Sequence, residues 1–520
     1  MVGSYQTDPW WYGGSCGASG PPPPQCTDAA WPWASNWSAA PGFFPSGLGA
    51  LGLPLTLYSN LFAQAPLNAM AQFEWVNCTS CRGGVPPYAR VAVEQSYDFH
   101  SHLFDAGAAW GMNAFEVDFS DFMFEGFADF ATDVRAFDAY WEGVNRASAE
   151  HAFPTQLCMS LPAITLSTPQ WSHVTNARLQ GDGYVTNAAR YDIFQTSLLY
   201  AALELAPFLD NVWTTGCQPA WDNAFGNATC EQHSEGLIAI ATLSSGPVGF
   251  GDRVGFTNAT LLNMTCRADG VLLQPSLPAV NLEAYYAGAL APAGSGARIA
   301  TAPSFISAAA GAANASAAGA APYPAHLRAQ PLPGAQYTFL TVLATFVGAD
   351  VAVAVGDVWR GGSAPPPGPP LGLYAQQLSR ASLCTEGAPA AAAGCAARSP
   401  GGPADTLLTA NTGAQGHDVW SIAPVLPGGW AVLGELAKFT RHSPQRLAGV
   451  DPGCSGRRAA PSLCLRAAGG AGEALQLAFV DPSGAVRLAS LVLDSQGGAA
   501  VACGCAPGGG GCACAAEAAA

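Results

Sequence analysis

The segment Phe115-Glu116-Val117-Asp118-Phe119-Ser120-Asp121-Phe122 decides the fold that we expect for this chain. Its apolar part, within Ala114–Phe119, predicts a buried strand, and carboxylates lie where that strand ends. In a parallel α/β barrel, the carboxyl ends of the strands carry the catalytic groups into the mouth of the barrel. We therefore predict that Asp118 is a catalytic nucleophile. The alternative is a carboxylate that caps the following helix, a role that suits Asp121 better.

Strand-like and helix-like segments alternate around this segment from residue 1 to about 290, a rhythm that indicates a parallel α/β fold. The predicted helices are Val91–Ala109, Phe127–His151, Ala188–Ala206 and Ser234–Leu243. The predicted strands are Tyr5–Tyr12, Leu55–Tyr58, Ala114–Phe119, Gln156–Leu161, Val174–Ala177, Asn211–Thr215 and Gly246–Phe250. A closed barrel has eight strands, so the remaining strand either precedes Met1 or is not recognisable from the pattern.

A sharp change in composition beyond residue 290 marks the expected domain boundary. We predict a (β/α)8 TIM barrel over 1–290, an Ala/Gly-rich linker region over 291–334, a C-terminal antiparallel β-sandwich over 335–500 and a Gly/Ala/Cys-rich tail over 501–520. Short β-branched runs punctuated by Gly and Pro are the basis for the sandwich. Four cysteines in the tail predict disulfides or a disordered segment, with a soft-metal site as the alternative.

The overall composition excludes several classes of function. Apolar residues make up 49% of the 520 residues, yet no stretch approaches the ~20 uninterrupted apolar residues of a membrane span. The formal charge of −16, without a basic cluster, disfavours a nucleic-acid partner. No phosphate-cradling Gly loop is present, so we expect no nucleotide cofactor. A metal site at His100-x-His102 lacks a third ligand, and a helix surface is the simpler interpretation.

Cysteines and sequons favour an oxidising, glycosylating compartment. The chain has 16 cysteines at irregular spacing, and we expect structural disulfides, including one at Cys78-x-x-Cys81. Its Asn-x-Ser/Thr sequons are Asn36, Asn77, Asn227, Asn258, Asn263 and Asn314. Both features predict the secretory pathway, either extracellular or vacuolar/lysosomal. Because Met1–Ser4 carries no signal-peptide features, we expect that a longer protein begins upstream.

A second carboxylate follows another predicted strand, in Val174-Thr175-Asn176-Ala177-Arg178-Leu179-Gln180-Gly181-Asp182. Retaining glycoside hydrolysis needs two carboxyl groups about 5–5.5 Å apart, one attacking the anomeric carbon and one exchanging protons. We predict Asp182 as the general acid/base. Arg178 would hold substrate hydroxyls or orient a carboxylate, and the alternative is an ordinary surface Arg–Asp pair.

Three further motifs, together with Arg178-x-x-x-Asp182, resemble clan D glycoside hydrolases, the group of α-galactosidases, raffinose synthases and seed imbibition proteins. The motifs are Gln218-Pro219-Ala220-Trp221-Asp222, then Ser244-Ser245-Gly246-Pro247-Val248-Gly249 with Asp252, and Arg267-Ala268-Asp269-Gly270-Val271-Leu272-Leu273. That group carries Gln-Pro-Asp-Trp-Asp, then Ser-Gly-Gly-Pro-Val with Ser-Asp, and a Pro-Asp-Gly-Ser-Ile-Leu stretch. Gly429–Lys438 resembles the sandwich of the group less specifically.

The resemblance implies a barrel, a retaining mechanism and α-galactosidic oligosaccharides or glycoconjugates as substrates, with no cofactor and no metal. It makes Asp118 the nucleophile and Asp182 the acid/base. The substrate-binding residues are then Asp8, Trp10, Trp11, Glu116, Cys158, Arg178, Trp221, Asp222 and Asp252. Barrel packing is the alternative for the two tryptophans, and a buried structural thiol is the alternative for the cysteine.

Glu116 departs from the resemblance, because the group usually has Lys two residues before its nucleophile. A carboxylate there still accepts sugar hydroxyls but tends to raise its neighbour's pKa. Two other functions therefore stay open beside hydrolysis: a raffinose-synthase-like galactosyltransferase and an inactive carbohydrate-binding protein. The sequence leaves the oligomeric state open.

Overall fold

The computed structural model divides into two compact units. We call Val2–Asp182 with Ala202–Asp210 the N-terminal unit, and Met1, Gly183–Ala201 and Asn211–Ala520 the C-terminal unit. The structure describes residues 4–7, 11–14, 34–39, 44–59, 61–63, 70–81, 87–179, 194–218, 231, 233–282, 298–307, 336–345, 351–354, 372–399, 406–410, 417–452, 462–506 and 511–517.

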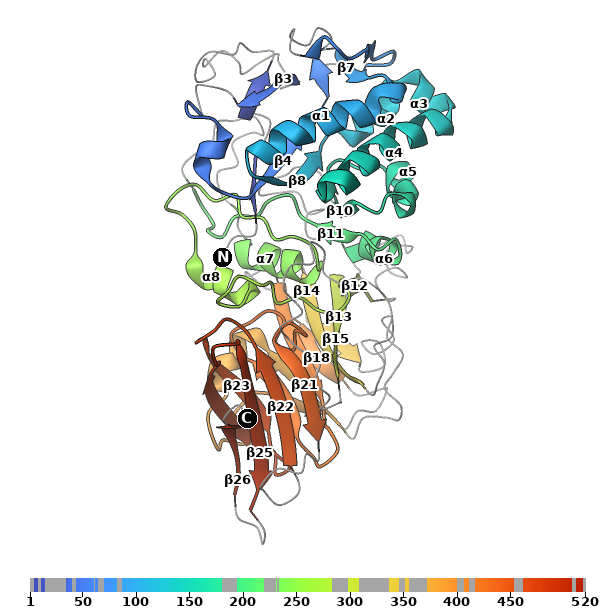
Figure 1. Ribbon diagram of the computed structural model, residues 1–520. Helices are drawn as coiled ribbons and strands as arrows, with labels where there is room; N and C mark the ends of the chain where they lie inside the picture. The colour runs from blue at the N-terminus through green and yellow to red at the C-terminus, as the bar shows by residue number, and fades with distance from the viewer. Residues whose placement is uncertain are drawn as a thin grey trace. The chain divides into compact units, whose positions relative to one another are not determined.

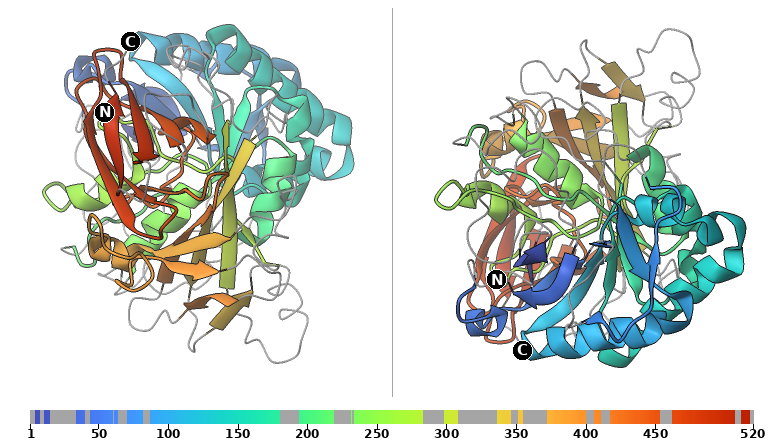
Figure 2. Two further views of the ribbon diagram at one scale, coloured as in Figure 1. Left: turned by 90° about the horizontal axis from the view of Figure 1, so that it is seen from below. Right: turned by 90° about the horizontal axis from the view of Figure 1, so that it is seen from above.

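A six-stranded parallel sheet is the centre of the N-terminal unit. In spatial order its strands are β1 (Tyr5–Gln6), β4 (Leu55–Ser59), β8 (Met112–Val117), β9 (Thr155–Leu157), β10 (Val174–Arg178) and β11 (Ala206–Phe208). The helices are α1 (Ser96–Ala109), α2 (Ser120–Gly126), α3 (Ala128–Thr132), α4 (Val134–His151) and α5 (Pro162–Ser167). Helices α1 and α4 pack on each other along one side of the sheet (Figure 1 and Figure 2).

Helix α4 shows how local sequence sets these boundaries. The Asp133 side chain accepts from the Arg135 backbone N–H and caps the helix, and Ala152 ends it in the left-handed conformation at φ 55°. One helix was predicted to run from Phe127 to His151, but two residues with extended backbone interrupt this stretch. Phe127 separates α2 from α3, and Asp133 separates α3 from α4. The buried face of α4 includes Phe137, Tyr140, Trp141 and Val144.

Helix α1 begins at Ser96 rather than at the predicted Val91, because Val91 still belongs to a strand and pairs with Trp75. His100 of α1 is only 4% exposed, so the helix-surface interpretation is wrong for this residue, whereas it is correct for His102. The His100 ring Nδ1 lies 2.7 Å from the Ser96 carbonyl oxygen, and burial lowers the pKa of the ring to about 4.

A second sheet in the N-terminal unit has the order β2 (Tyr12–Gly14), β3 (Ala34–Ala39), β5 (Phe62–Ala63), β7 (Tyr88–Val91) and β6 (Trp75–Asn77). The single strand predicted over Tyr5–Tyr12 is therefore wrong: its two ends, β1 and β2, lie in different sheets. The predicted disulfide between Cys78 and Cys81 is confirmed and follows β6 directly.

The C-terminal unit is mainly antiparallel. Its largest sheet has the order β12 (Val280–Asn281), β13 (Arg298–Ser307), β14 (Gln336–Thr345), β19 (His417–Pro424), β16 (Leu373–Gln377) and β17 (Ala397–Ser399). Three smaller sheets are β15 (Val351–Ala354) with β18 (Thr406–Ala410); β20 (Ala431–Glu435), β23 (Ala474–Val480) and β24 (Val486–Val492); and β21 (Leu447–Pro452), β22 (Ser462–Ala468), β25 (Gly498–Cys505) and β26 (Cys512–Glu517).

A shared core joins these sheets into a layered β domain. Phe339 of β14, Trp430, Leu477 of β23 and Leu463 of β22 are each fully buried in it. Ten residues of the stretch expected to be a linker, Arg298–Ser307, form β13 and supply buried side chains. The chain thus consists of an α/β unit followed by a mainly β unit, which agrees with the predicted order of an α/β domain and a β domain.

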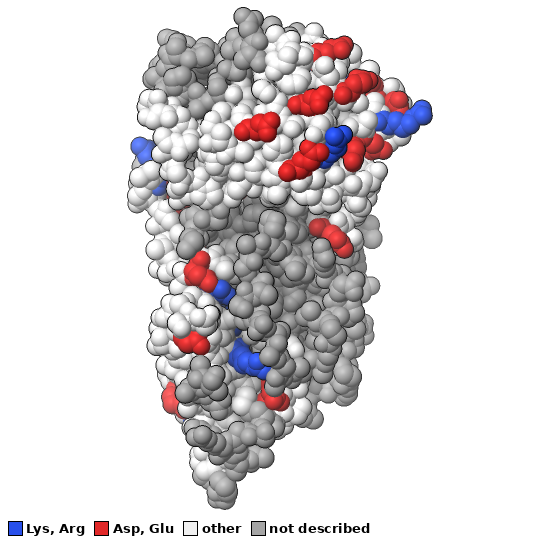
Figure 3. Space-filling view, viewed as in Figure 1, with Lys and Arg blue, Asp and Glu red and all other residues white. Residues whose placement is uncertain are grey.

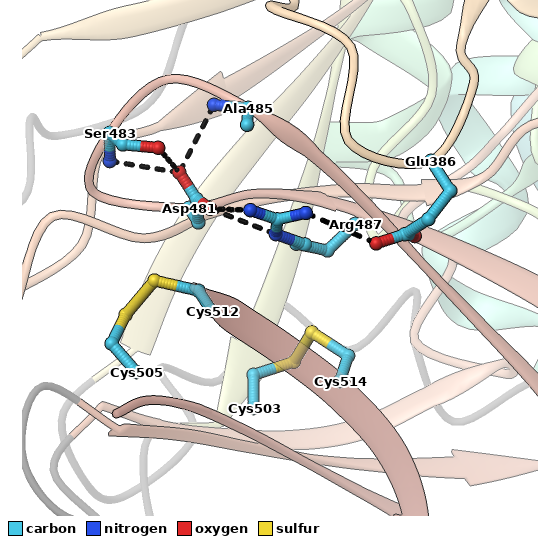
Figure 4. Close-up of a disulfide and its surroundings, with 9 residues drawn as sticks. All are labelled: Glu386, Asp481, Ser483, Ala485, Arg487, Cys503, Cys505, Cys512 and Cys514. Carbon is cyan, nitrogen blue, oxygen red and sulfur yellow. Dashed lines mark hydrogen bonds and ion pairs between the residues drawn. A yellow bond between two sulfur atoms is a disulfide. The ribbon is translucent and has the colours of Figure 1, made fainter. Parts of the chain in front are cut away.

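The cysteine-rich end of the chain belongs to this β domain. Strand β26 pairs with β25, and the disulfides Cys503–Cys514 and Cys505–Cys512 cross that pair (Figure 4). The disulfide-linked alternative for the tail is therefore confirmed, and these thiols are not available to a soft metal. Figure 4 also shows the Asp481 carboxylate, which accepts from Ser483 and Ala485 and pairs with Arg487.

The C-terminal unit also holds α7 (Ser234–Leu243), which matches its predicted range, and α8 (Ala259–Thr265). Helix α6 (Phe194–Ala202) is shorter than predicted. The strands predicted at Asn211–Thr215 and Gly246–Phe250 are reduced to one parallel bridge between Val212 and Phe250. The described residues thus contain six parallel strands in the N-terminal unit and one parallel bridge in the C-terminal unit, whereas the predicted barrel has eight strands.

Among the charged side chains on the described surface of the N-terminal unit, acidic ones are the more numerous kind in the view of Figure 3. Exposed acidic residues there include Asp98, Asp105, Glu125, Glu142 and Glu150. Such a surface repels polyanions, in keeping with the formal charge of −16. In the described part of the chain, no helix combines the length and apolar character needed to cross a membrane.

Candidate active site

The register of the parallel sheet places polar side chains in rows on one of its faces. Glu116 of β8 pairs with Tyr58 of β4 on one side and with Gln156 of β9 on the other, and Asn176 of β10 pairs with Gln156. Successive side chains of a strand point to opposite faces, so residues two positions further on share the face and lie nearer the carboxyl ends. Those residues are three of the predicted site residues, Asp118, Cys158 and Arg178.

Asp118 is held in a fixed position at the carboxyl end of β8. Its backbone N–H donates to the Ser59 carbonyl oxygen at 2.8 Å, which continues the pairing of β8 with β4. The Tyr58 hydroxyl donates to Asp118 Oδ2 at 2.7 Å, and the Phe119 N–H donates to Asp118 Oδ1 at 2.7 Å. The side chain is 7% exposed, so these bonds act in a largely desolvated environment.

Phe119 marks a sharp turn directly after Asp118. Its backbone has φ 52° and ψ 36°, the left-handed conformation that residues with a side chain adopt rarely. Such conformations concentrate at functional sites, where the surrounding structure maintains them. Helix α2 starts at the next residue with no side-chain cap, so neither Asp118 nor Asp121 has the helix-capping role considered from the sequence.

Arg178 lies at the end of β10 with an acidic partner. Its Nη1 is 3.0 Å from Asp210 Oδ2, and the arginine side chain is 3% exposed. The arginine is therefore buried and Asp210 is partly buried, whereas Asp182, the acidic partner in the surface pair that was the alternative, lies outside the described residues. Asp210 lies two residues beyond Phe208, which pairs with Arg178 in the sheet. It was not recognised from the sequence, although Pro207-Phe208-Leu209-Asp210 repeats the pattern of an apolar run that ends in a carboxylate.

Glu116, Cys158 and Asp210 form a compact group, with their potential ligand atoms within 4.8 Å of one another; the first two are buried and Asp210 is partly exposed. Two carboxylates and a thiol can bind a cation, but Arg178 already supplies a positive charge to Asp210. A metal would have to displace that guanidinium group. We therefore assign no metal to the site.

The Cys158 thiol is kept protonated by its surroundings. Burial is the largest cause, and the negative charge of Asp118 also raises the pKa of this thiol, well above its usual range. Arg178 acts in the opposite direction but does not compensate. A buried neutral thiol of this kind contributes by packing and weak hydrogen bonding, not as a nucleophile.

Two amide side chains lie in the row below these groups. Asn176 Nδ2 donates to Gln156 Oε1 at 2.6 Å, and both side chains are buried. They fill the face of the sheet beneath Asp118 and Cys158 with neutral polar groups. Neither was singled out from the sequence.

Gln218 and Asp252, which come from two of the motifs that resemble clan D enzymes, connect two loops in the C-terminal unit. The Asp252 carboxylate accepts from the Thr214 N–H at 2.8 Å, the Thr214 hydroxyl at 2.7 Å and the Gln218 amide at 2.7 Å. Gln218 Oε1 in turn accepts from the Arg253 N–H at 2.7 Å. Asp252, predicted to bind substrate, thus connects two loops through these hydrogen bonds.

Residues within or directly beside the remaining motifs make further hydrogen bonds in the C-terminal unit. Gln274 Nε2 donates to the Gly246 carbonyl oxygen at 2.6 Å. Lys438, the single lysine of the chain, donates to the Cys266 carbonyl oxygen at 2.8 Å and to that of Asn263. Carbonyl groups at the C-terminal end of a helix have no partner within the helix, and a cation is favourable there. The Lys438 ammonium group takes this position at the end of α8. The Gly429–Lys438 segment therefore carries structural contacts.

Trp11 is packed into the N-terminal unit. It is 2% exposed, its indole N–H donates to the Tyr58 carbonyl oxygen at 2.9 Å, and its ring meets Trp37 edge-on at 4.8 Å. The packing alternative accounts for this residue. The other predicted site residues lie outside the described residues: Asp8, Trp10, Asp182, Trp221 and Asp222.

Comparison with solved structures finds clan D glycoside hydrolases. One is a GH27 β-L-arabinopyranosidase from Geobacillus stearothermophilus, with 14% identity, a TM-score of 0.47, and coverage of 81% of this chain and 87% of that one. Another is an α-galactosidase from Thermus thermophilus in complex with stachyose, with 15% identity, a TM-score of 0.30, and coverage of 45% and 54%. No protein-family model and no curated protein sequence matches the chain.

Proposed function

We propose that this chain is a retaining glycoside hydrolase that acts on α-galactosides, with Asp118 as nucleophile and Asp182 as general acid/base. The observation that carries the proposal is the position of Asp118: a buried carboxylate at the carboxyl end of a parallel strand, held by two hydrogen bonds. The substrate class rests on the resemblance of the ordered sequence motifs to clan D enzymes. We further propose that the parallel sheet closes into an eight-stranded barrel.

In the first chemical step, Asp118 attacks the anomeric carbon while Asp182 gives its proton to the leaving oxygen. The glycosidic C–O bond breaks, the aglycone leaves as an alcohol, and the sugar forms an ester with Asp118. In the second step, Asp182 takes a proton from water, and the water oxygen attacks the anomeric carbon. The ester bond breaks and free galactose is released, with both carboxyl groups returned to their starting states.

Tyr58 and Phe119 prepare the nucleophile for this step. Each Asp118 oxygen accepts one hydrogen bond from the protein and keeps a further lone pair for reaction. The carboxylate is therefore oriented before the sugar arrives, and little conformational freedom remains to be lost during attack. Tyr58 is a positioning residue in this account.

The charges around Asp118 fit a neutral sugar. Glu116 takes the position where the resembled group usually has Lys, and Arg178 is the buried cation of the described site. We propose that Arg178, held by Asp210, donates to sugar hydroxyls, and that the Glu116 carboxylate accepts from one. This arrangement replaces the contact that an ammonium group would make.

The experiment that tests the proposal measures hydrolysis of an aryl α-galactoside by the wild type, Asp118→Ala and Asp182→Ala. We expect both variants to lose at least 1,000-fold in kcat while their far-ultraviolet circular dichroism spectra stay those of the folded wild type. Azide should restore turnover of Asp118→Ala and give a galactosyl azide. Near-normal activity in either variant would contradict the assignment.

The reaction products distinguish hydrolysis from the two other functions, galactosyl transfer and carbohydrate binding without turnover. With sucrose as an added acceptor, a transferase yields a longer oligosaccharide, whereas a hydrolase yields free galactose. A binding protein retains galactosides in equilibrium dialysis and releases neither product.

A further inference from the structure

The sequon Asn77-Cys78-Thr79 lies at an exposed strand end of the N-terminal unit, apart from the candidate active site. We propose that Asn77 carries an N-linked glycan. Asn77 is the last residue of β6, and its side chain is exposed to solvent. In its sheet β6 is an edge strand, paired on one side with β7 through Asn77 and Ala89. Among the described residues, no strand pairs with β6 on its other side, so a bulky hydrophilic group there meets no described strand.

The modification joins the Asn77 carboxamide to a lipid-pyrophosphate-linked oligosaccharide. The C–N bond forms between Asn77 Nδ2 and the anomeric carbon of the first sugar. The bond from that carbon to the phosphate oxygen breaks, the lipid pyrophosphate leaves, and the amide loses one proton to solvent. No oxidant or metal-bound group of this chain takes part.

The neighbouring disulfide supports the compartment in which this transfer occurs. Cys78, the middle residue of the sequon, is bonded to Cys81. Disulfides also join Cys384 to Cys395 and cross the β25–β26 pair. Structural disulfides of this number are typical of proteins that fold in an oxidising compartment, which is also where N-glycosylation occurs. The acceptor sequence and this disulfide thus share Cys78.

The fold also sets the time at which the glycan is added. The Thr79 hydroxyl, which the acceptor motif requires, accepts from the Ala128 N–H at 2.9 Å and donates to the Gly126 carbonyl oxygen at 3.4 Å. Once the α2–α3 turn has docked there, the hydroxyl is engaged on both sides. Transfer to Asn77 therefore precedes the docking of residues 126–128, while the chain is still being synthesised or folded.

Asn258 provides an internal contrast within the same chain. Its Oδ1 caps α8 by accepting from the Thr260 N–H at 3.0 Å and the Leu261 N–H at 3.4 Å, and the side chain is half-buried. Asn77 has no such capping role in its strand. The glycan at Asn77 in turn covers an exposed sheet edge that would otherwise be open to pairing with another chain.

The test expresses the full 520-residue chain behind a cleavable secretory leader in eukaryotic cells. Enzymatic deglycosylation in ¹⁸O-labelled water converts a glycosylated Asn to Asp with a mass increase, which peptide mass spectrometry locates. We expect more than half of the Asn77 peptide to carry the label, none in Asn77→Gln, and retained labelling in the conservative Thr79→Ser. An unlabelled Asn77 in secreted wild-type protein overturns the proposal, and this readout does not depend on how a variant folds.

A second measurement tests the timing. Unglycosylated wild-type protein, folded and purified, is incubated with the oligosaccharide donor and transferase, in parallel with a reduced and unfolded sample. We expect labelling of Asn77 at least tenfold higher in the unfolded sample. Equal labelling of the folded protein contradicts the argument from the Thr79 contacts.

Discussion

Replacing Tyr58 by Phe should lower the free energy of unfolding by about 1.5–3 kcal/mol, the contribution of a hydrogen bond to a charged group. The hydroxyl donates to Asp118 Oδ2 at 2.7 Å, and the two residues are 2% and 7% exposed. Bulk water therefore cannot replace the lost donor freely. Phe keeps the aromatic ring, so the change isolates the hydroxyl from the packing around it.

A double-mutant cycle assigns this energy to the pair. Urea unfolding at pH 7 is measured for the wild type, Tyr58→Phe, Asp118→Ala and the combined variant. We expect a coupling energy of about 1.5 kcal/mol or more between Tyr58 and Asp118. In the hydrolysis assay, Tyr58→Phe alone should lower kcat/KM about tenfold or more, because the nucleophile loses one of its two orienting bonds. Additive losses, with a coupling below about 0.5 kcal/mol, would refute the reasoning.

Three further predictions concern the surroundings of the site. Because burial lowers the pKa of His100 from 6.5 to about 4, the unfolded chain binds a proton between these values that the folded chain excludes. Stability should therefore fall by up to about 3 kcal/mol as the pH drops from 6.5 to 4, and His100→Leu should lose less over that interval in chemical denaturation. Cys158 should resist iodoacetamide at pH 8 in the folded protein and react after unfolding; labelling of the native protein, located by mass spectrometry, would contradict its burial. Gln218→Glu should put a carboxylate against Asp252 and speed amide exchange of Thr214 by about tenfold or more, whereas unchanged exchange would mean that the loops do not depend on this contact.

The parallel sheet was predictable where strands are short apolar runs with clear ends. Leu55–Tyr58 and Val174–Ala177 each lie within one residue of an observed strand. Tyr5–Tyr12 failed as a single strand because Pro9, a residue type that interrupts strands, was not taken as the boundary between β1 and β2. Strand β13 was not predicted because it lies in an Ala- and Gly-rich stretch that was taken as a linker. Its pairing with β14 over ten residues is a long-range contact that the local composition does not indicate.

Within the candidate site, sequence reasoning found the groups that follow a strand and carry an unusual residue type. Asp118 and Arg178 were identified in this way and Cys158 through the family resemblance, and the sheet register places all three on one face. Tyr58 was missed, because an aromatic residue in a strand indicates core packing unless its neighbour across the sheet is known. Asp210 was missed because the predicted helix ended at Ala206 and the next predicted strand began at Asn211, so that β11 was not recognised as a strand.

The role of Asp118 can be tested most directly by trapping the covalent intermediate. The wild type is treated with a 2-deoxy-2-fluoro-galactosyl fluoride, which slows release of the sugar from a retaining enzyme, and is then digested and analysed by mass spectrometry. The account predicts one fluorosugar per chain, attached to the peptide that contains Asp118, with loss of hydrolysis in proportion to labelling. Stoichiometric labelling of a different carboxylate, with Asp118 unmodified, would contradict it.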